Sequence, residues 1–150
     1  MKEENMRIQR YAYFSVAMVF AMCMILYAAD FKVYPSAKLD EKLTKEANEF
    51  GKAVRKDQYQ TKASIYVTSD SFEKVADFYK TMGKEYKMPG AAGKTRKLPS
   101  GKDLKQAYVI FDGASDLGSS KLWAKVQRPY ISFTLEEGPD MTYIVVSEKK

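Results

Sequence analysis

The sequence contains no histidine and only one cysteine among its 150 residues. The absence of histidine excludes Ser-His-Asp and Cys-His catalytic pairs, histidine-ligated metals and imidazole pH switches. The single cysteine, Cys23, lies inside an apolar run, so an intramolecular disulfide, a CxxC site and an iron–sulfur ligand set are excluded as well. No remaining motif identifies a reaction, and we therefore expect no enzymatic activity, no cofactor and no metal site.

The rest of the composition is that of a folded chain. It is 45% hydrophobic, 29% charged and 13% aromatic, which is too apolar for a disordered protein. The length suits one small domain with an additional segment, and it is too short for two full domains.

One long hydrophobic run indicates the cellular compartment. Residues 11–29 carry no charge, and as a helix they would be about 28 Å long, close to the hydrocarbon thickness of a bilayer. Three basic residues precede the run, and aromatic residues stand at both of its ends. We predict a cytoplasmic tail over 1–10, a transmembrane signal anchor over 11–29, a linker over 30–36 and an extracytoplasmic, periplasmic domain over 37–150.

A cleaved signal peptide is the alternative interpretation of this run. Cleavage after Ala29 would place Tyr27 three positions before the new terminus, where the peptidase prefers a small residue. An uncleaved anchor is therefore favoured, and the alternative product would be a secreted, soluble binding protein. Ala17 and Ala21 form a small-xxx-small pair that could mark a helix-packing face within the membrane.

The remainder of the chain predicts an α+β domain. Ser36 is expected to cap a helix over about 37–56, and a strand is expected over 63–68. Asp70 is expected to cap a second helix, with Gly83 at its C-cap position. Further strands are expected over 106–112, 121–130 and 141–147. Consecutive late strands favour a two-layer fold, with a mainly antiparallel sheet of about four strands and both helices on one face.

The net charge of +6 is concentrated in residues 84–105, where seven basic residues stand against two acidic ones. Glycine and proline in the same stretch predict a mobile surface loop. Lys94, Arg96, Lys97 and Lys102 are candidate contacts for an anionic partner, such as a lipid head group, an envelope polymer or an acidic subunit. Nucleic acid is not expected as a partner, because the predicted compartment lacks it. The alternative is a solvated loop that keeps the domain soluble.

Strand 121–130 offers a second candidate surface. Leu122, Ala124 and Val126 would share one face of this strand, so Trp123 and Lys125 point to the other. If that face is outward, Trp123, Lys125 and Arg128 form an amphipathic docking surface. The alternative is a Trp123 buried beneath helix 37–56. The proline after Arg128 also predicts an edge strand that is available for pairing.

These features favour a single-pass membrane-anchored, non-enzymatic accessory or interaction protein. Its extracytoplasmic domain would bind another membrane protein subunit, a second copy of itself, or an anionic lipid or envelope polymer. A small carboxylate-dependent hydrolase is the alternative from a different class, because Asp70, Asp112 and Asp116 could converge near strand ends.

Overall fold

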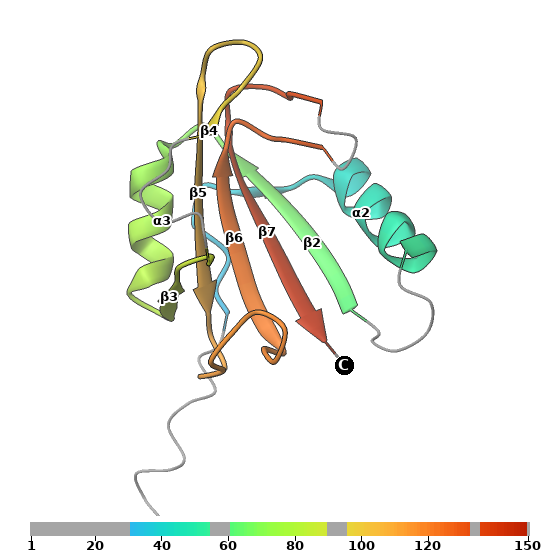
Figure 1. Ribbon diagram of the computed structural model, residues 1–150, viewed down its shortest axis with the longest axis vertical. Coiled ribbons are helices and arrows are strands. Elements are labelled where there is room, and N and C mark those ends of the chain that lie inside the picture. The colour runs from blue at the N-terminus through green and yellow to red at the C-terminus, as the bar shows by residue number, and fades with distance from the viewer. Residues whose placement is uncertain (1–30, 55–60, 90–95, 133–135, 150) are drawn as a thin grey trace, which may run out of the picture.

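The computed structural model describes residues 31–54, 61–89, 96–132 and 136–149. Its centre is an antiparallel sheet in the order β1-β2-β7-β6-β5-β3, with β4 also paired to β5 (Figure 1). The strands are β1 (Lys38–Leu39), β2 (Thr61–Thr68), β3 (Lys84–Tyr86), β4 (Arg96–Lys97), β5 (Asp103–Ile110), β6 (Leu122–Arg128) and β7 (Thr142–Lys149).

The predicted α+β class, the antiparallel sheet and the two helices are confirmed. The four strands expected from sequence correspond to β2, β5, β6 and β7, which make up most of the sheet. The short strands β1, β3 and β4 were not predicted, because two or three residues are too few to show an alternating pattern. The basic stretch expected to be a mobile loop contains β3 and β4, both paired with β5.

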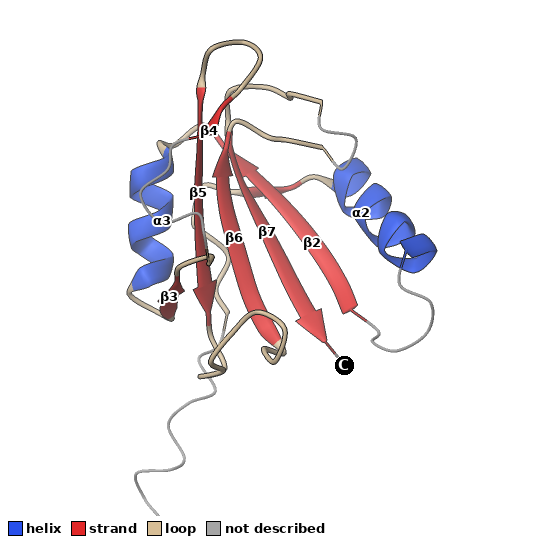
Figure 2. Ribbon diagram, viewed as in Figure 1, coloured by secondary structure: helices blue, strands red, loops and turns tan. Residues whose placement is uncertain are grey.

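The two helices cover opposite faces of the sheet, so the expectation of both on one face is wrong (Figure 2). Helix α3 (Phe72–Lys80) packs on Ala124, Val126 and Ile144, and α2 (Glu41–Val54) packs on Ile65. Adjacent residues of one strand point to opposite faces, and β7 is apolar at both sets of positions from Tyr143 to Val146. This continuous apolar run requires cover on both sides.

The helix ends also differ from the prediction. Asp40, not Ser36, precedes α2, and its carboxylate accepts a hydrogen bond from the Leu43 amide at 3.0 Å. Ser71, not Asp70, is the N-cap of α3. The C-cap of α3 is Thr81, so the prediction for Gly83 is wrong too. These errors share a cause, because each segment offers several capping residues within a few positions.

The segment that enters the domain is packed into its core. The Phe31 ring stacks on Tyr79 at a centroid distance of 5.6 Å. Tyr34 is buried, and its backbone amide donates to the Tyr79 hydroxyl at 3.0 Å. The Tyr34 hydroxyl donates to Asp70 at 2.8 Å, and Ser36 donates to the same carboxylate oxygen at 2.9 Å. Residues predicted as a linker therefore hold the entering chain against α3.

No helix within the described residues is long and apolar enough to cross a membrane. The predicted tail over 1–10 and span over 11–29, with Ala17 and Ala21, lie outside the described residues.

Candidate functional site

A pocket of about 590 Å³ lies between α2 and the face of the sheet that this helix covers in part. Helix α2 packs over β2 and leaves the β5–β6 side of the same face open (Figure 1). A volume in this range is typical of small-molecule sites in proteins. The residues that line the sheet side of the pocket include Thr61, Ala63, Ile65, Leu104, Gln106, Tyr108, Trp123, Lys125, Gln127, Val145 and Ser147.

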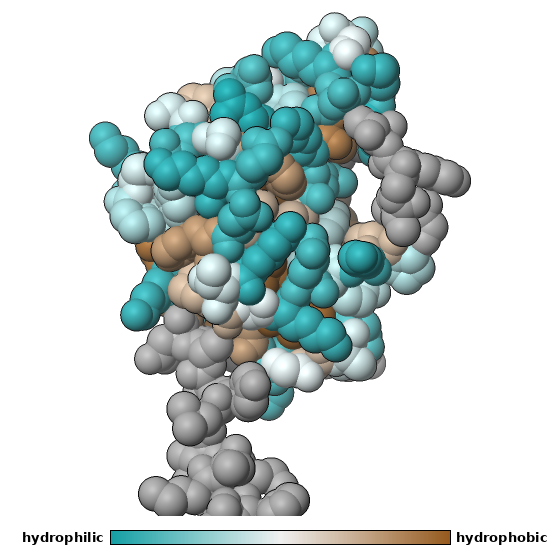
Figure 3. All heavy atoms as spheres, turned by 90° about the vertical axis from the view of Figure 1, so that its left-hand side faces the viewer, coloured by the Kyte–Doolittle hydropathy of each residue, from teal (hydrophilic) through white to brown (hydrophobic). Residues whose placement is uncertain are grey.

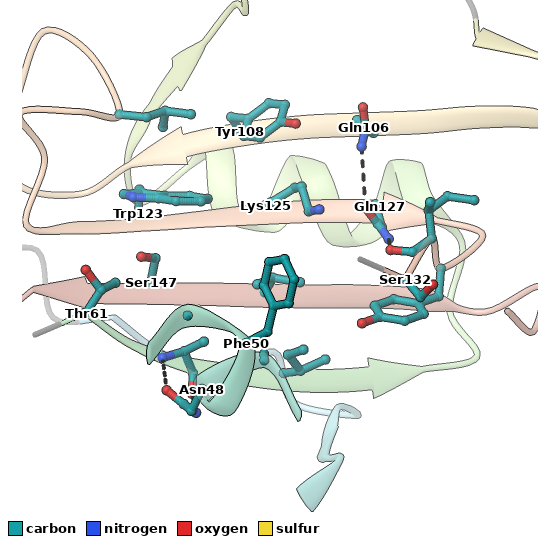
Figure 4. A pocket seen from close by; sticks show the side chains of 18 of the residues that line it. Asn48, Phe50, Thr61, Gln106, Tyr108, Trp123, Lys125, Gln127, Ser132 and Ser147 are labelled. Atoms are coloured by element: carbon teal, nitrogen blue, oxygen red, sulfur yellow. Dashed lines mark hydrogen bonds between the residues drawn. The ribbon is translucent and has the colours of Figure 1, made fainter. Parts of the chain in front are cut away.

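Three side chains of β6 form the floor of the pocket. Trp123, Lys125 and Gln127 lie in a row because they alternate with Ala124 and Val126, which face α3 (Figure 4). The neighbouring strand β5 places Tyr108 beside this row, with its ring centroid 6.4 Å from that of Trp123. The floor is thus an aromatic surface with a cation at its centre.

Lys125 is the charged group of this floor. It is half-buried, and no described carboxylate lies within ion-pair distance of its amine. Burial lowers the pKa of Lys125, since an unpaired ammonium loses hydration when its surroundings are apolar. A ligand with a negative charge would restore the lost stabilisation of the ammonium form.

Polar side chains are placed at both ends of the row. Gln127 is fully buried, and its side-chain oxygen accepts a long hydrogen bond of 3.4 Å from Gln106. At the Trp123 end, Thr61 and Ser147 point toward the pocket (Figure 4). The Thr61 hydroxyl is buried and has no hydrogen-bond partner among the described residues. Unsatisfied buried hydroxyls are uncommon, and this one lines the pocket.

Exposed apolar side chains of α2 stand at the opening. Phe50 is 45% exposed and Val54 is 62% exposed, and both line the pocket. Figure 4 shows the Phe50 ring directed toward the β6 row from across β7. The opposite side of the molecule differs, since hydrophilic residues cover most of the surface around α3 and β3 (Figure 3).

The predicted docking surface of Trp123, Lys125 and Arg128 is divided between the two faces. Trp123 and Lys125 share the pocket, whereas Arg128 pairs with Asp140 at 2.9 Å and donates to the Asp70 carbonyl oxygen at 3.2 Å. Arg128 is an even-numbered residue of β6, so it points away from the pocket. The predicted pairing edge is wrong as well, because β6 lies between β5 and β7 and Pro129 stands just beyond its end.

The basic residues of 84–105 are partly neutralised. Lys97 pairs with Asp103 at 2.7 Å, and Lys102 pairs with Glu137 at 3.6 Å, within or beside the β4–β5 hairpin. Arg96 is exposed and lines the pocket, so it adds positive charge at the pocket's rim. Lys94 lies outside the described residues. The predicted basic patch thus contributes one described residue to the site.

The three aspartates do not converge. Asp70 adjoins Arg128, the last residue of β6, whereas Asp112 accepts a hydrogen bond from the amide of Leu122, the first residue. Six residue steps along the strand separate these ends by about 20 Å. Asp112 and Asp116 hold the turn of one loop through backbone amides, including that of Ser119 at 2.9 Å. The described residues contain no group of three or more acidic or sulfur ligands that could hold a metal ion.

Burial raises the pKa of Asp112, but hydrogen bonds from the backbone of Lys121 and the hydroxyl of Ser120 outweigh it and hold the pKa below its ordinary value. Hydrogen bonds from Tyr34 and Ser36 likewise lower the pKa of Asp70. Both carboxylates are therefore stabilised as hydrogen-bond acceptors. A general acid requires the opposite shift, toward a raised pKa.

The sequence predicted the two central residues of the pocket, Trp123 and Lys125, but not the residues of its walls. Strand alternation places Trp123 and Lys125 on one face, but nothing local indicates that Tyr108, Thr61 and Phe50 meet them. The pairing of β6 with β5 would have found Tyr108, and the pairing of β7 with both β6 and β2 would have found Thr61. Comparisons of this chain with protein-family models, with curated proteins and with solved structures give no match.

Proposed function

We propose that this protein is a membrane-anchored, non-enzymatic binding domain that takes up an anionic component on the open face of its sheet. One observation carries the proposal. The pocket brings a half-buried Lys125, which has no ion-pair partner in the part of the chain that the structure describes, beside the aromatic rings of Trp123 and Tyr108. Such a combination offers apolar contact area and one charge.

The anchor is the second part of the proposal, and it is supported by the uncharged run over 11–29. The described chain begins at Phe31, which stacks on Tyr79 in the core. Only one residue, Asp30, separates Ala29 from Phe31 in the sequence. An anchored domain would therefore stand close to the membrane surface, on the extracytoplasmic side that the basic N-terminal flank favours.

A protein partner is a second candidate occupant of the same face, favoured by the exposed apolar side chains at the pocket mouth. Phe50, Val54 and Met88 are all more than one third exposed, and together they could pack against a partner subunit or a second copy of the chain. In that case the proposed role is that of an accessory subunit.

Photo-crosslinking in native membranes tests the proposal. A benzoylphenylalanine is placed at Phe50, at the pocket mouth, and in a control at Asp77, which is exposed on α3 on the other side of the sheet. We expect adducts from position 50 and not from position 77, in the membrane fraction, on a chain that retains Met1 by mass spectrometry. Equal labelling from both positions would contradict use of the pocket face. A chain beginning near residue 30 would contradict the anchor.

A further inference from the structure

We infer that the pocket binds a small amphipathic organic acid, with its carboxylate on Lys125 and its apolar body along Trp123 and Tyr108. The inference rests on the proposed binding function and specifies the ligand class. It starts from the position of the charge. Lys125 lies midway along the floor, with Trp123 on one side and Gln127 on the other, so an anion paired with it is surrounded by the pocket walls (Figure 4).

The number of cations limits the headgroup to one negative charge. Lys125 is the half-buried cation of the described lining, and Arg96 stands exposed at the rim. A phosphate dianion usually takes several cations or a row of backbone amides. The backbone amides of β6 are already paired with β5 and β7. A monoanion needs one ammonium, and this site supplies one.

The body of the ligand is defined by the rest of the lining. Trp123 and Tyr108 offer flat rings on the floor, and Phe50 and Val145 offer apolar contact from α2 and β7. At the Trp123 end, the Thr61 hydroxyl is buried without a described partner, so a polar substituent on the ligand could be hydrogen-bonded there. The volume of about 590 Å³ admits a molecule of roughly ten to twenty non-hydrogen atoms.

Trp123 is the chain's only tryptophan, so its fluorescence reports on the pocket alone. The full chain in phosphatidylcholine vesicles is titrated with 4-phenylbutanoate and, as the uncharged match, with 4-phenylbutan-1-ol. Neither probe absorbs appreciably at a 295 nm excitation wavelength. We expect a saturable change in Trp123 emission with the acid and at least tenfold weaker binding of the alcohol.

Variants of the cation test its role. Lys125→Met should weaken binding of the acid at least tenfold and leave binding of the alcohol unchanged. Lys121→Met is the control, because Lys121 is exposed just before β6 and outside the pocket lining. Lys125→Arg keeps the charge and should retain binding within a few-fold, so loss of fold in the methionine variant would not conceal the result. Equal binding of acid and alcohol would overturn the inference, as would undiminished acid binding by a folded Lys125→Met protein.

No saturable change with either probe would also overturn the inference of a small acid. The photo-crosslinking result is independent of these titrations. Protein adducts from position 50, together with no fluorescence change in the titrations, would still support a binding domain. They would assign its pocket to a protein partner.

Discussion

The two faces of the sheet are built from the same strands but differ in how completely they are covered. On the α3 face, Val109, Ala124 and Val126 are fully buried, and aromatic rings close the space beneath the helix. On the α2 face, Trp123 and Lys125 remain half-buried beside a pocket. One face therefore stabilises the domain, and the other retains a surface that a ligand can reach. Adjacent residues of one strand point to opposite faces and so have these two different roles.

Truncation of a buried side chain should give the largest difference in stability between the two faces of the sheet. Ile144 is fully buried toward α3, and its neighbour Val145 lines the pocket on the other face. We expect Ile144→Ala to lower the free energy of unfolding by about 3 kcal/mol, because it leaves a cavity in a closed core. Val145→Ala should cost about 1 kcal/mol, since its surroundings are already open. Urea denaturation of both variants measures the difference, and similar losses would mean that the two faces are equally packed.

Replacement of two glycines by alanine should change the stability of the protein in opposite directions. A Cβ at Gly83 would lie 2.6 Å from a methyl of Val109 and 2.7 Å from the Ile110 carbonyl oxygen, and a backbone atom cannot easily move aside. Gly83→Ala should therefore destabilise the protein by about 2 kcal/mol. Gly51, inside α2, has nothing within 4 Å of the same position. Gly51→Ala should stabilise by about 0.5–1 kcal/mol, because alanine favours the helix.

Thermal unfolding of these two variants gives the comparison directly. A rise in melting temperature for position 51 and a fall for position 83 is expected. Destabilisation at both positions would mean that Gly51 is surrounded as closely as Gly83.

The smallest expected effect is the pH dependence of stability that comes from Lys125 in the pocket. Burial lowers the pKa of Lys125 in the folded protein, so the penalty for its ammonium form is fully present below that lowered pKa. It is relieved as the pH rises from there toward the unfolded value of about 10.4. The ligand-free wild type should therefore gain stability relative to Lys125→Met over this interval. Urea titrations at pH 7, 9 and 10 measure the gap between the two proteins.

Lys121→Met is the matched control for this pH series, because it removes a lysine whose side chain is exposed and lies outside the pocket lining. A constant gap for Lys125→Met would show that its amine is as well hydrated in the folded state as in the unfolded chain.

Sequence reasoning was most reliable where a pattern is local and long. The alternation of Leu122, Ala124 and Val126 predicted one apolar face of β6, and that face packs under α3. The position of α2 on the other face could not be predicted the same way, because an amphipathic stripe shows that a helix packs without showing on what. The pocket exists because α2 lies on that face of the sheet. Strand alternation was enough to predict Trp123 and Lys125 on the floor of the pocket. The walls of the pocket depend on the pairing of β6 with β5 and β7.

The basic stretch over 84–105 shows what a count of charges along the chain leaves out. Composition indicated a continuous positive surface, but ion pairs form with acidic residues that are distant or spaced irregularly in the chain. Lys105 pairs with Glu73 at 2.5 Å, and Lys102 pairs with Glu137. Counting charge along the chain does not detect neutralisation between segments that only the fold brings together.

The packing of Phe31 and Tyr34 determines how freely an anchored domain could move. Ala29 and Phe31 are two residue steps apart, with only Asp30 between them, and two steps extend at most about 7 Å, which is far shorter than a flexible tether of the usual length. The domain could not swing away from the bilayer to search the envelope. It would meet only molecules that dissolve in, or pass through, the layer next to the membrane, where an amphipathic acid is concentrated by partitioning. The pocket of an anchored domain could then remain occupied with modest affinity, because an anchor would raise the effective concentration of a ligand in this layer.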